Sequence, residues 1–204
     1  MDHEQDAEQI IALYHEGADV WDSQRQHAFI ERHWLERLVC LIPARGEILD
    51  IGCGAGVPIA EYFLRQRFRV TGIDASEAMI ARCRQRFPQA QWQVADMRAL
   101  ALQRTFHGLI AWDSFFHLTR EHQRAMFPRF ARHAEPGAAL LFTSGPGAGE
   151  TMGTFLDRPL YHASLAHEEY RQLLADNGFQ VRMQVTEDAS CGGHTVWLAQ
   201  WARG

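Results

Sequence analysis

The chain has 204 residues, 47% of them hydrophobic, which suits one α/β domain with a core of its own. Its formal net charge of -5 gives no overall positive field, so we expect neither nucleic acid nor a membrane surface as a partner. The Lys and Arg count of 20 consists entirely of Arg. The lack of Lys excludes Schiff-base enzymes, Walker A nucleotide-binding proteins and Tyr-x-x-x-Lys dehydrogenases.

The cysteines Cys40, Cys53, Cys83 and Cys191 are far apart in the sequence and form no Cys-x-x-Cys pair. This spacing indicates neither a zinc site nor a disulfide framework, and we expect no bound metal. Separated thiols are typical of a reducing compartment. The first residues are acidic and polar, and no later run approaches the roughly 18 apolar residues of a membrane span. The sequence therefore predicts a cytoplasmic protein.

Helical periodicity covers residues 5–42 and predicts two helices with a break near Trp21. We expect residues 1–44 to form a helical cap on an α/β core of residues 45–204, within a single domain. In that core, short apolar runs alternate with Arg-rich amphipathic segments, as in buried parallel strands covered by helices. Strands are predicted at 48–51, 70–73, 92–95, 109–112 and 138–143, and crossover helices at 58–66, 76–86 and 120–133.

The end of the chain departs from this alternation. A helix is predicted at 166–177, where Asn177-Gly178 is a common helix stop. Strands near 179–185 and 194–201 follow, and the link between them is too short for a helical crossover, so they must pair antiparallel. Before that helix, the Gly-rich stretch 144–153 is expected to be a mobile loop. The fold predicted from these elements is a doubly wound α/β sheet.

The strongest motif is the strand and Gly-rich turn Asp50-Ile51-Gly52-Cys53-Gly54-Ala55-Gly56, which opens a helix. Glycines let a ligand approach the backbone closely, and the free amides of the helix start face that ligand. In dinucleotide enzymes the third Gly would fall at position 57, which is Val57 here. The carboxylate of Asp50 suits a positively charged ligand, such as S-adenosylmethionine (SAM), and would repel a pyrophosphate.

Two more acids follow the next two predicted strands. Asp74 lies 22 residues after Gly52, where a carboxylate can accept hydrogen bonds from both hydroxyls of a ribose. Asp96 follows the third strand and can accept from the amino group of an adenine, while Met97 and Met79 can pack on the ring faces. Because the carboxyl ends of parallel strands lie at one edge of the sheet, we expect the acids to lie close together.

In these motifs the sequence resembles the class I SAM-dependent methyltransferase superfamily, over about residues 47–201. The resemblance extends to Ile110-Ala111-Trp112-Asp113-Ser114 and Glu135-Pro136-Gly137. It implies a Rossmann-like seven-stranded sheet in the order 3-2-1-4-5-7-6 with the seventh strand antiparallel. SAM would be the cofactor and S-adenosylhomocysteine (SAH) the product. The residues expected to contact the cofactor are Asp50, Gly52, Cys53, Gly54, Asp74, Ala75, Met79, Asp96, Met97 and Trp112.

Three further stretches, 111–118, 161–165 and 194–198, resemble a bacterial branch of this superfamily that acts on small molecules. The fourth strand ends in Trp112-Asp113-Ser114-Phe115, not in the Asn/Asp-Pro-Pro-aromatic motif of amide and adenine N-methyltransferases. No Pro-Cys pair supplies the nucleophile of cytosine C5 enzymes. We therefore expect a small-molecule acceptor, methylated on oxygen, nitrogen or sulfur by a monomer or homodimer.

Methyl transfer is an in-line displacement, so catalysis depends largely on alignment, with a base needed only for a protonated acceptor. His117, just past the fourth strand, and His162 are candidates for the base or for an orienting group. For both, a structural role in packing or capping remains open. Candidates for acceptor binding are Tyr14, Trp21, Ser114 and Tyr161. Tyr14 also fits burial on a helix stripe, and Trp21 fits a lid.

Two other functions stay open at this point. A nicotinamide-dependent oxidoreductase would share the Gly-rich turn, although the glycine spacing, Asp50 and the missing Lys weigh against it. A non-catalytic SAM-binding module would keep the whole cofactor site, since no catalytic residue is obligatory for this chemistry.

Overall fold

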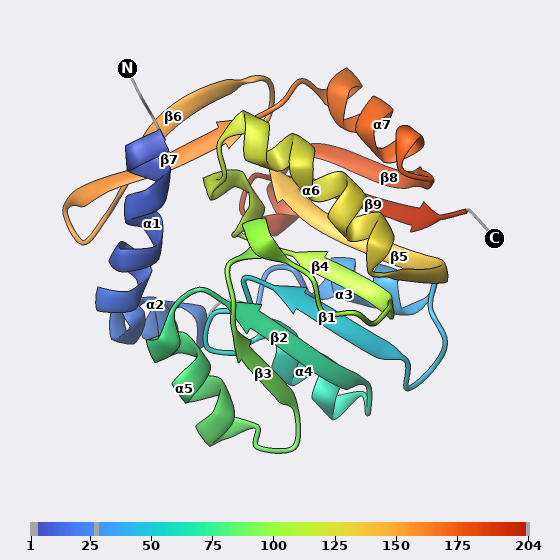
Figure 1. Cartoon of the computed structure of the whole chain (residues 1–204), viewed down its shortest axis with the longest axis horizontal. Coiled ribbons are helices and arrows are strands. Elements are labelled where there is room, and N and C mark those ends of the chain that lie inside the picture. The colour runs from blue at the N-terminus through green and yellow to red at the C-terminus, as the bar shows by residue number, and fades with distance from the viewer. Residues whose placement is uncertain (1–3, 27–28, 203–204) are drawn as a thin grey trace.

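The computed structural model describes residues 4–26 and 29–202. Seven strands form one sheet with helices on both of its faces (Figure 1). The elements of this core are β1 (Glu47–Ile51), α4 (Ile59–Arg65), β2 (Arg69–Asp74), α5 (Glu77–Arg86), β3 (Gln91–Val94), β4 (Phe106–Ala111), α6 (Arg120–Arg132), β5 (Ala134–Ser144), α7 (His167–Asp176), β8 (Phe179–Asp188) and β9 (His194–Trp201). Short 3-10 turns are η1 (Met97–Ala99), η2 (Phe115–His117) and η3 (Ala189–Cys191).

The strand order is β3-β2-β1-β4-β5-β9-β8. Strand β1 pairs parallel with β2 and β4, while β9 runs antiparallel to both β5 and β8. The strands β6 (Gly149–Phe155) and β7 (Arg158–Ser164) form a separate two-stranded sheet. Without them, β8 and β9 are the sixth and seventh strands, so the predicted α/β fold and its order are confirmed.

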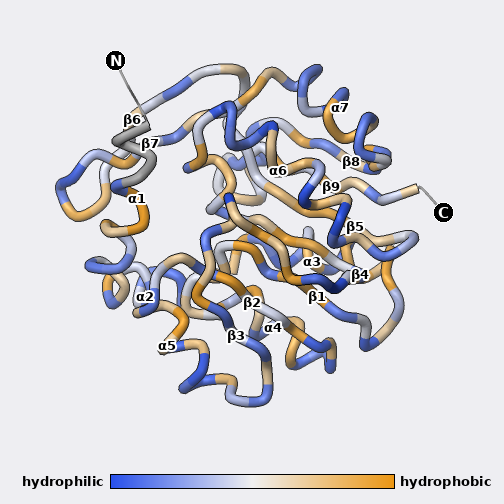
Figure 2. Tube along the Cα trace, in the orientation of Figure 1, coloured by the Kyte–Doolittle hydropathy of each residue, from blue (hydrophilic) through white to orange (hydrophobic). Residues whose placement is uncertain are grey.

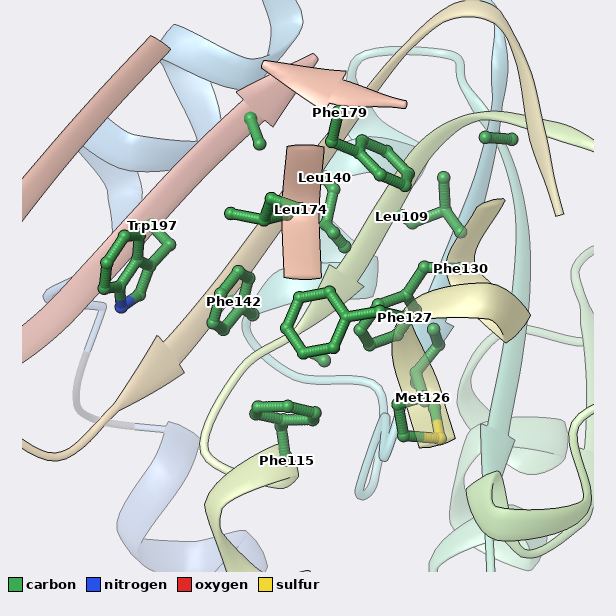
Figure 3. Packing of buried hydrophobic residues seen from close by; sticks show 14 of the residues in the cluster. Leu109, Phe115, Met126, Phe127, Phe130, Leu140, Phe142, Leu174, Phe179 and Trp197 are labelled. Atoms are coloured by element: carbon green, nitrogen blue, oxygen red, sulfur yellow. The ribbon is translucent and has the colours of Figure 1, made fainter. Parts of the chain in front are cut away.

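The two faces of the sheet are built from alternate residues of the same strands, because successive side chains of a strand point to opposite sides. Leu49 and Leu109 face α6 and α7, and Figure 3 shows the aromatic cluster on this side, with Phe127, Phe142 and Trp197 packed together. The neighbouring strand residues face α3 (Arg32–Val39), α4 and α5. Hydrophobic stretches therefore run through the central strands β1, β2 and β4 (Figure 2).

The N-terminal segment forms three helices, α1 (Glu4–Glu16), α2 (Ala18–Gln26) and α3. The prediction of two helices with a break near Trp21 is wrong, since Trp21 lies inside α2 and one break falls at Gly17. A Cβ added at Gly17 would come within 2.5 Å of the ring of Phe155, so this tertiary contact requires glycine there. Residues 27–28 lie outside the described part. Helix α3 packs under the sheet, and only α1 and α2 lie over its carboxyl edge.

The hairpin of β6 and β7 corrects the prediction of a mobile loop over 144–153, because residues 149–153 belong to β6. Its two-residue turn, Leu156 and Asp157, has positive φ values of 53° and 56°, as in the turns that favour tight hairpins. Helix α1 packs against this hairpin through Ile10 and Leu13 (Figure 1). Within residues 4–26 and 29–202, none of the helices has both the length and the apolar character required to cross a bilayer.

Candidate active site

A cavity lies at the carboxyl ends of β1, β2 and β4, where the three parallel strands end side by side. Helices α1 and α2 contribute Tyr14 and Trp21 to its wall. All the residues predicted to contact the cofactor line it: Asp50, Gly52, Cys53, Gly54, Asp74, Ala75, Met79, Asp96, Met97 and Trp112. Ser114 and His117 line it as well, so the fold brings most of the predicted site residues to one place.

The Gly-rich turn is closely packed at Gly52 and has free space beside it at Gly54. Gly52 has a φ of 75°, and an added Cβ there would lie 2.4 Å from the Cβ of Ser114. This close approach lets the Ser114 hydroxyl donate to the carbonyl of Ile51 over 2.8 Å, so Ser114 anchors the turn. At Gly54, with a φ of 52°, an added Cβ would meet only Trp21, at 3.6 Å. The turn thus presents bare backbone to the cavity at Gly54.

Asp74 ends β2 with its carboxylate fixed by backbone amides. Its Oδ2 accepts from the amide of Gly54 over 2.9 Å, and its Oδ1 accepts from the amide of Ser76 over 2.8 Å. Burial raises the pKa of Asp74, and these two hydrogen bonds oppose that rise. Each carboxylate oxygen keeps a second lone pair. The carboxylate can therefore accept from two ligand hydroxyls while it holds the Gly-rich turn against α5.

Asp50 is a buried acid of the cavity whose carboxylate is only partly satisfied and whose pKa is raised. Its side chain is 2% exposed, and its Oδ2 has no hydrogen-bond partner among the described residues. Burial and then the negative charge of Asp74 raise the pKa of Asp50 to about 7. A buried carboxylate without a partner is costly, and a cationic ligand removes that cost. This orphaned oxygen beside an open glycine backbone fits SAM, which carries an ammonium and a sulfonium.

Asp96 lies at the start of η1, on the side of the cavity that Met79 and Met97 line. Its Oδ1 accepts from the amide of Arg98 and its Oδ2 from Nε of Arg98, each over 2.8 Å. Burial alone would raise the pKa of Asp96, but these contacts and the charge of Arg98 lower it. The amino group of an adenine could therefore donate to a carboxylate that is ionised and already oriented by Arg98.

His117 and Tyr14 line the same cavity and contact each other. Oη of Tyr14 lies 3.0 Å from Nε2 of His117, whose Nδ1 lies 2.8 Å from the carbonyl oxygen of Tyr161. A carbonyl only accepts, so Nδ1 carries the proton and Nε2 accepts from the Tyr14 hydroxyl. Burial lowers the pKa of His117 to about 4, and burial followed by the charge of Asp113 raises the pKa of Tyr14. His117 is therefore neutral, with both ring nitrogens in use.

Tyr161 and His162 lie in β7, outside the lining of this cavity. Tyr161 is 1% exposed and packs with Ile10 and Leu13 of α1, and its carbonyl contacts His117 of the site. The ring of His162 lies 4.8 Å from that of His117 and lines a separate hollow beside Phe116 and the 144–149 segment. Both residues therefore contact His117 without lining the cavity that it lines.

The structure adds Asp113, which the sequence interpretation placed in a motif without giving it a role. It lies two residues after β4 and lines the cavity, and its Oδ1 lies 2.7 Å from Nε2 of His194. Burial alone would lower the pKa of His194, but Asp113 more than offsets this and the pKa is raised. The available signal was position, since Asp113 follows a parallel strand as Asp74 and Asp96 do.

Arg25 is a second addition, at the end of α2. It lines the cavity and forms an ion pair with Glu31, a fully buried residue whose pKa is raised by burial despite the charge of Arg25. The charge of Arg25 also lowers the pKa of Asp50. Nothing in the periodicity of the N-terminal segment distinguishes this arginine from its exposed neighbours, so the sequence carried no signal for it.

Comparison with known proteins agrees with this geometry. A family model described as a methyltransferase domain matches residues 48–137. The chain is 29% identical to a trans-aconitate 2-methyltransferase of Azoarcus sp. (strain BH72), over 90% of this chain and 79% of that protein. It is 33% identical to a dTDP-3-amino-3,4,6-trideoxy-alpha-D-glucopyranose N,N-dimethyltransferase of Streptomyces venezuelae, over 48% of this chain and 42% of that protein.

Among solved structures, the SAM-bound amino pentose methyltransferase CalS10 from Micromonospora echinaspora superposes with a TM-score of 0.71 at 18% identity, covering 89% of this chain and 96% of that one. The matched domain is that of methyltransferases, which leaves the nicotinamide-dependent alternative without support. The site itself agrees, because a buried carboxylate faces the Gly-rich turn where a pyrophosphate would have to bind. Residues 48–137 match a methyltransferase domain, and the relative and the solved structure that resemble most of the chain are methyltransferases, so the chain is a SAM-dependent methyltransferase.

Proposed function

We propose that the enzyme transfers the methyl group of SAM to a small-molecule acceptor by in-line displacement. The observation that carries this proposal is the cavity itself, which is lined both by the carboxylates Asp50 and Asp74 and by the Tyr14–His117 pair. The relatives named above act on small molecules according to their names, trans-aconitate and a nucleotide-linked amino sugar.

We assign a different part of the cofactor to each of the three acids. Asp74 would accept from the ribose hydroxyls, and Asp50 would face the positive charge of the methionine part. Asp96 would accept from the adenine amino group between Met79 and Met97. When bound, SAM supplies a methyl group made electrophilic by its sulfonium. The roles of Gly52, Cys53, Gly54, Ala75 and Trp112 in this proposal are to line the cofactor with backbone and apolar surface.

Tyr14 and His117 would orient the acceptor rather than act as a strong base. His117 is a poor proton acceptor, because its pKa is lowered to about 4 and its Nε2 already accepts from Tyr14. Alignment of the acceptor with the methyl group therefore accounts for most of the acceleration of methyl transfer, as expected for displacement at an activated methyl group. Trp21 packs edge-on against Tyr14, with ring centroids 5.1 Å apart, and would help exclude water.

We propose one methyltransferase domain for residues 1–204, in which α1 and α2 serve as the cap over the cofactor. Asp22 of α2 forms an ion pair with Arg86 of α5, and Asp19 forms one with Arg82, so two ion pairs join the cap to helix α5 of the core. The working form would be a monomer or homodimer in the cytoplasm. All four cysteines are described, and each is a free thiol, as in a reducing compartment.

The test is a SAM-consumption assay over a panel of small metabolites, combined with calorimetry of SAH binding. We expect SAH to bind with a micromolar or lower dissociation constant and at least one metabolite to be methylated. Binding of SAH without turnover on any metabolite would favour a non-catalytic SAM-binding module instead. Absence of SAH binding would overturn the proposal as a whole.

A further inference from the structure

Asp113 is held in an unusual backbone conformation at the tip of β4. Its φ of 49° lies in the left-handed region, which residues other than glycine rarely occupy. The amide of Asp113 donates to Oγ1 of Thr143 over 3.0 Å, which ties this conformation to the neighbouring strand β5. Strained conformations of this kind persist where the surroundings hold them and are concentrated at functional sites. The result is a carboxylate that is 14% exposed and lines the cavity.

Asp113 lines the cavity together with Tyr14 and His117. Its charge acts on the pKa of Tyr14, His117 and His162. Asp50, by contrast, responds to the charge of Asp74. Asp74 also raises the pKa of Tyr14, so Asp113 is a further acid of the same cavity, beyond the three assigned to the cofactor.

His194 fixes one oxygen of this carboxylate. Nδ1 of His194 lies 2.6 Å from the carbonyl oxygen of Cys191, so Nδ1 carries a proton, and Nε2 lies 2.7 Å from Oδ1 of Asp113. A proton must also lie between Nε2 and Oδ1, because two lone pairs at that distance would repel each other. The buried Oδ1 has no other partner among the described residues, and its contact with His194 does not involve Oδ2. Asp113 is therefore oriented through one oxygen and can bind a ligand through the other.

The positive charges that line the cavity are already matched by carboxylates. Among the described residues, Arg25 and Arg98 are the arginines of the lining, and they pair with Glu31 and Asp96. His117 is neutral because burial lowers its pKa to about 4. His194 is held by Asp113 itself, so an acceptor with a carboxylate would find this histidine and the lining arginines already paired, whereas an acceptor with an N–H group could donate to the second oxygen of Asp113.

Building on the proposed function, we propose that Asp113 binds the reacting group of the acceptor and that this group is an amine. In the transfer, the nitrogen lone pair forms the new N–C bond while the C–S bond breaks and leaves its electron pair on sulfur. The positive charge moves from sulfur to nitrogen, toward Asp113, and the product leaves as a methylated ammonium that exchanges its proton with water. A fixed carboxylate at the point where charge develops stabilises that transition state. His194 is a positioning residue for Asp113.

The test uses two ligands that differ at the reacting centre. Sinefungin carries an amine in place of the methyl-bearing sulfonium of SAM, and SAH carries neither an amine nor a charge at this point. Calorimetry on the whole protein should show that Asp113→Asn weakens the binding of sinefungin about tenfold or more. This change corresponds to about 1.4 kcal/mol for a lost charge interaction. The same substitution should change the dissociation constant of SAH less than about twofold. Asp96→Asn, a matched acid at another strand tip, should change both affinities by the same factor.

A second pair of variants tests the positioning role of His194. His194→Ala should weaken the binding of sinefungin more than the binding of SAH. His194→Gln can still donate to Asp113 and should keep much of the affinity for sinefungin. An unchanged ratio of sinefungin to SAH affinity in Asp113→Asn would overturn the inference while leaving the proposed function intact. Failure of the unaltered protein to bind either ligand would overturn both. Identification of a carboxylate as the methylated group would also overturn the inference.

Discussion

Tyr14 and His117 are 103 positions apart in the sequence, yet the tyrosine hydroxyl lies 3.0 Å from Nε2 of the histidine. The contact joins helix α1 of the cap to the turn η2 after β4. Because Nδ1 of His117 is bound to the carbonyl of Tyr161, the chain of hydrogen bonds continues into the hairpin strand β7. One polar chain therefore links three parts of the fold.

The first prediction concerns this chain. Tyr14→Phe keeps the ring but leaves the buried Nε2 of His117 without a donor, which should lower kcat about fivefold to tenfold, as for the loss of about 1 kcal/mol. The dissociation constant of SAH should stay within about twofold, because the cofactor carboxylates are untouched. Tyr62→Phe, on α4 outside the cavity lining, is the matched control and should behave as the unaltered enzyme. A kcat that Tyr14→Phe leaves unchanged would remove Tyr14 from the acceptor site.

The second prediction concerns cofactor binding at Asp74. Asp74→Ala should weaken SAH binding by about 1.5–3 kcal/mol, the range for hydrogen bonds to a charged group. Asp74→Asn should weaken it less, because the amide oxygen can still accept from one backbone amide or one hydroxyl. Calorimetry measures both constants. Unchanged affinity in Asp74→Ala would reject the assignment of the ribose to this carboxylate.

The third prediction is a pH dependence of SAH binding. Burial and the charge of Asp74 raise the pKa of Asp50 to about 7 in the ligand-free protein, so lowering the pH below 7 neutralises the group that should face the ammonium of the ligand. Affinity for SAH should fall by up to about tenfold per pH unit in that range. Asp50→Asn should bind more weakly at pH 8 and should lose this dependence. A wild-type affinity that stays flat between pH 5.5 and 8 would argue against contact with Asp50.

The fourth prediction follows from the same shift but concerns folding. The folded protein keeps the proton of Asp50 up to a pKa of about 7, while the unfolded chain loses it near the ordinary value of about 4. The free energy of unfolding contributed by this group is thus highest at low pH and falls as the pH rises through 7. Asp50→Asn should therefore stabilise the ligand-free protein by about 1–2 kcal/mol at pH 8, and by less at pH 5. Urea denaturation at both pH values measures this, and destabilisation at pH 8 would contradict the prediction.

The fifth prediction compares two glycines. At Gly52 an added Cβ would lie 2.4 Å from Cβ of Ser114, in a backbone with a φ of 75°. Gly52→Ala should lower the free energy of unfolding by about 2–3 kcal/mol and should displace the cofactor turn. At Gly147 an added Cβ meets nothing within 4 Å, so Gly147→Ala is the matched control. Equal stability of the two variants in urea denaturation would show that the turn adapts.

The cofactor site could be predicted from the sequence because its determinants are local. The apolar runs before Asp50 and Asp74 fix where two strands end, and parallel pairing then brings the ends together. The N-cap role of Ser76 was predictable for the same reason, and its hydroxyl accepts from the amide of Met79 over 3.3 Å. The assignment of individual residues to cofactor and acceptor remains a prediction.

The parts that sequence reasoning missed depend on contacts between distant segments. The helix break at Gly17 is imposed by the ring of Phe155, and neither residue alone carries that information. The hairpin strand β6 begins in a Gly-rich stretch, which hides the alternation typical of a strand. The pairing of Asp113 with His194 joins the tip of β4 to the start of β9. Its left-handed backbone has no signature in the residue type.

The packing of α1 on the hairpin has a consequence for the order of folding during synthesis. Helix α1 leaves the ribosome before the hairpin does, but Ile10 and Leu13 are buried against Phe155 and Leu160, which are made much later. A nascent chain that ends before the hairpin has no partner for this apolar surface, although the strands β1 to β4 are already present. The helical cap of α1 and α2 can therefore pack over the cofactor site only after most of the sheet has been synthesised. A growing chain arrested before β6 should bind SAH weakly.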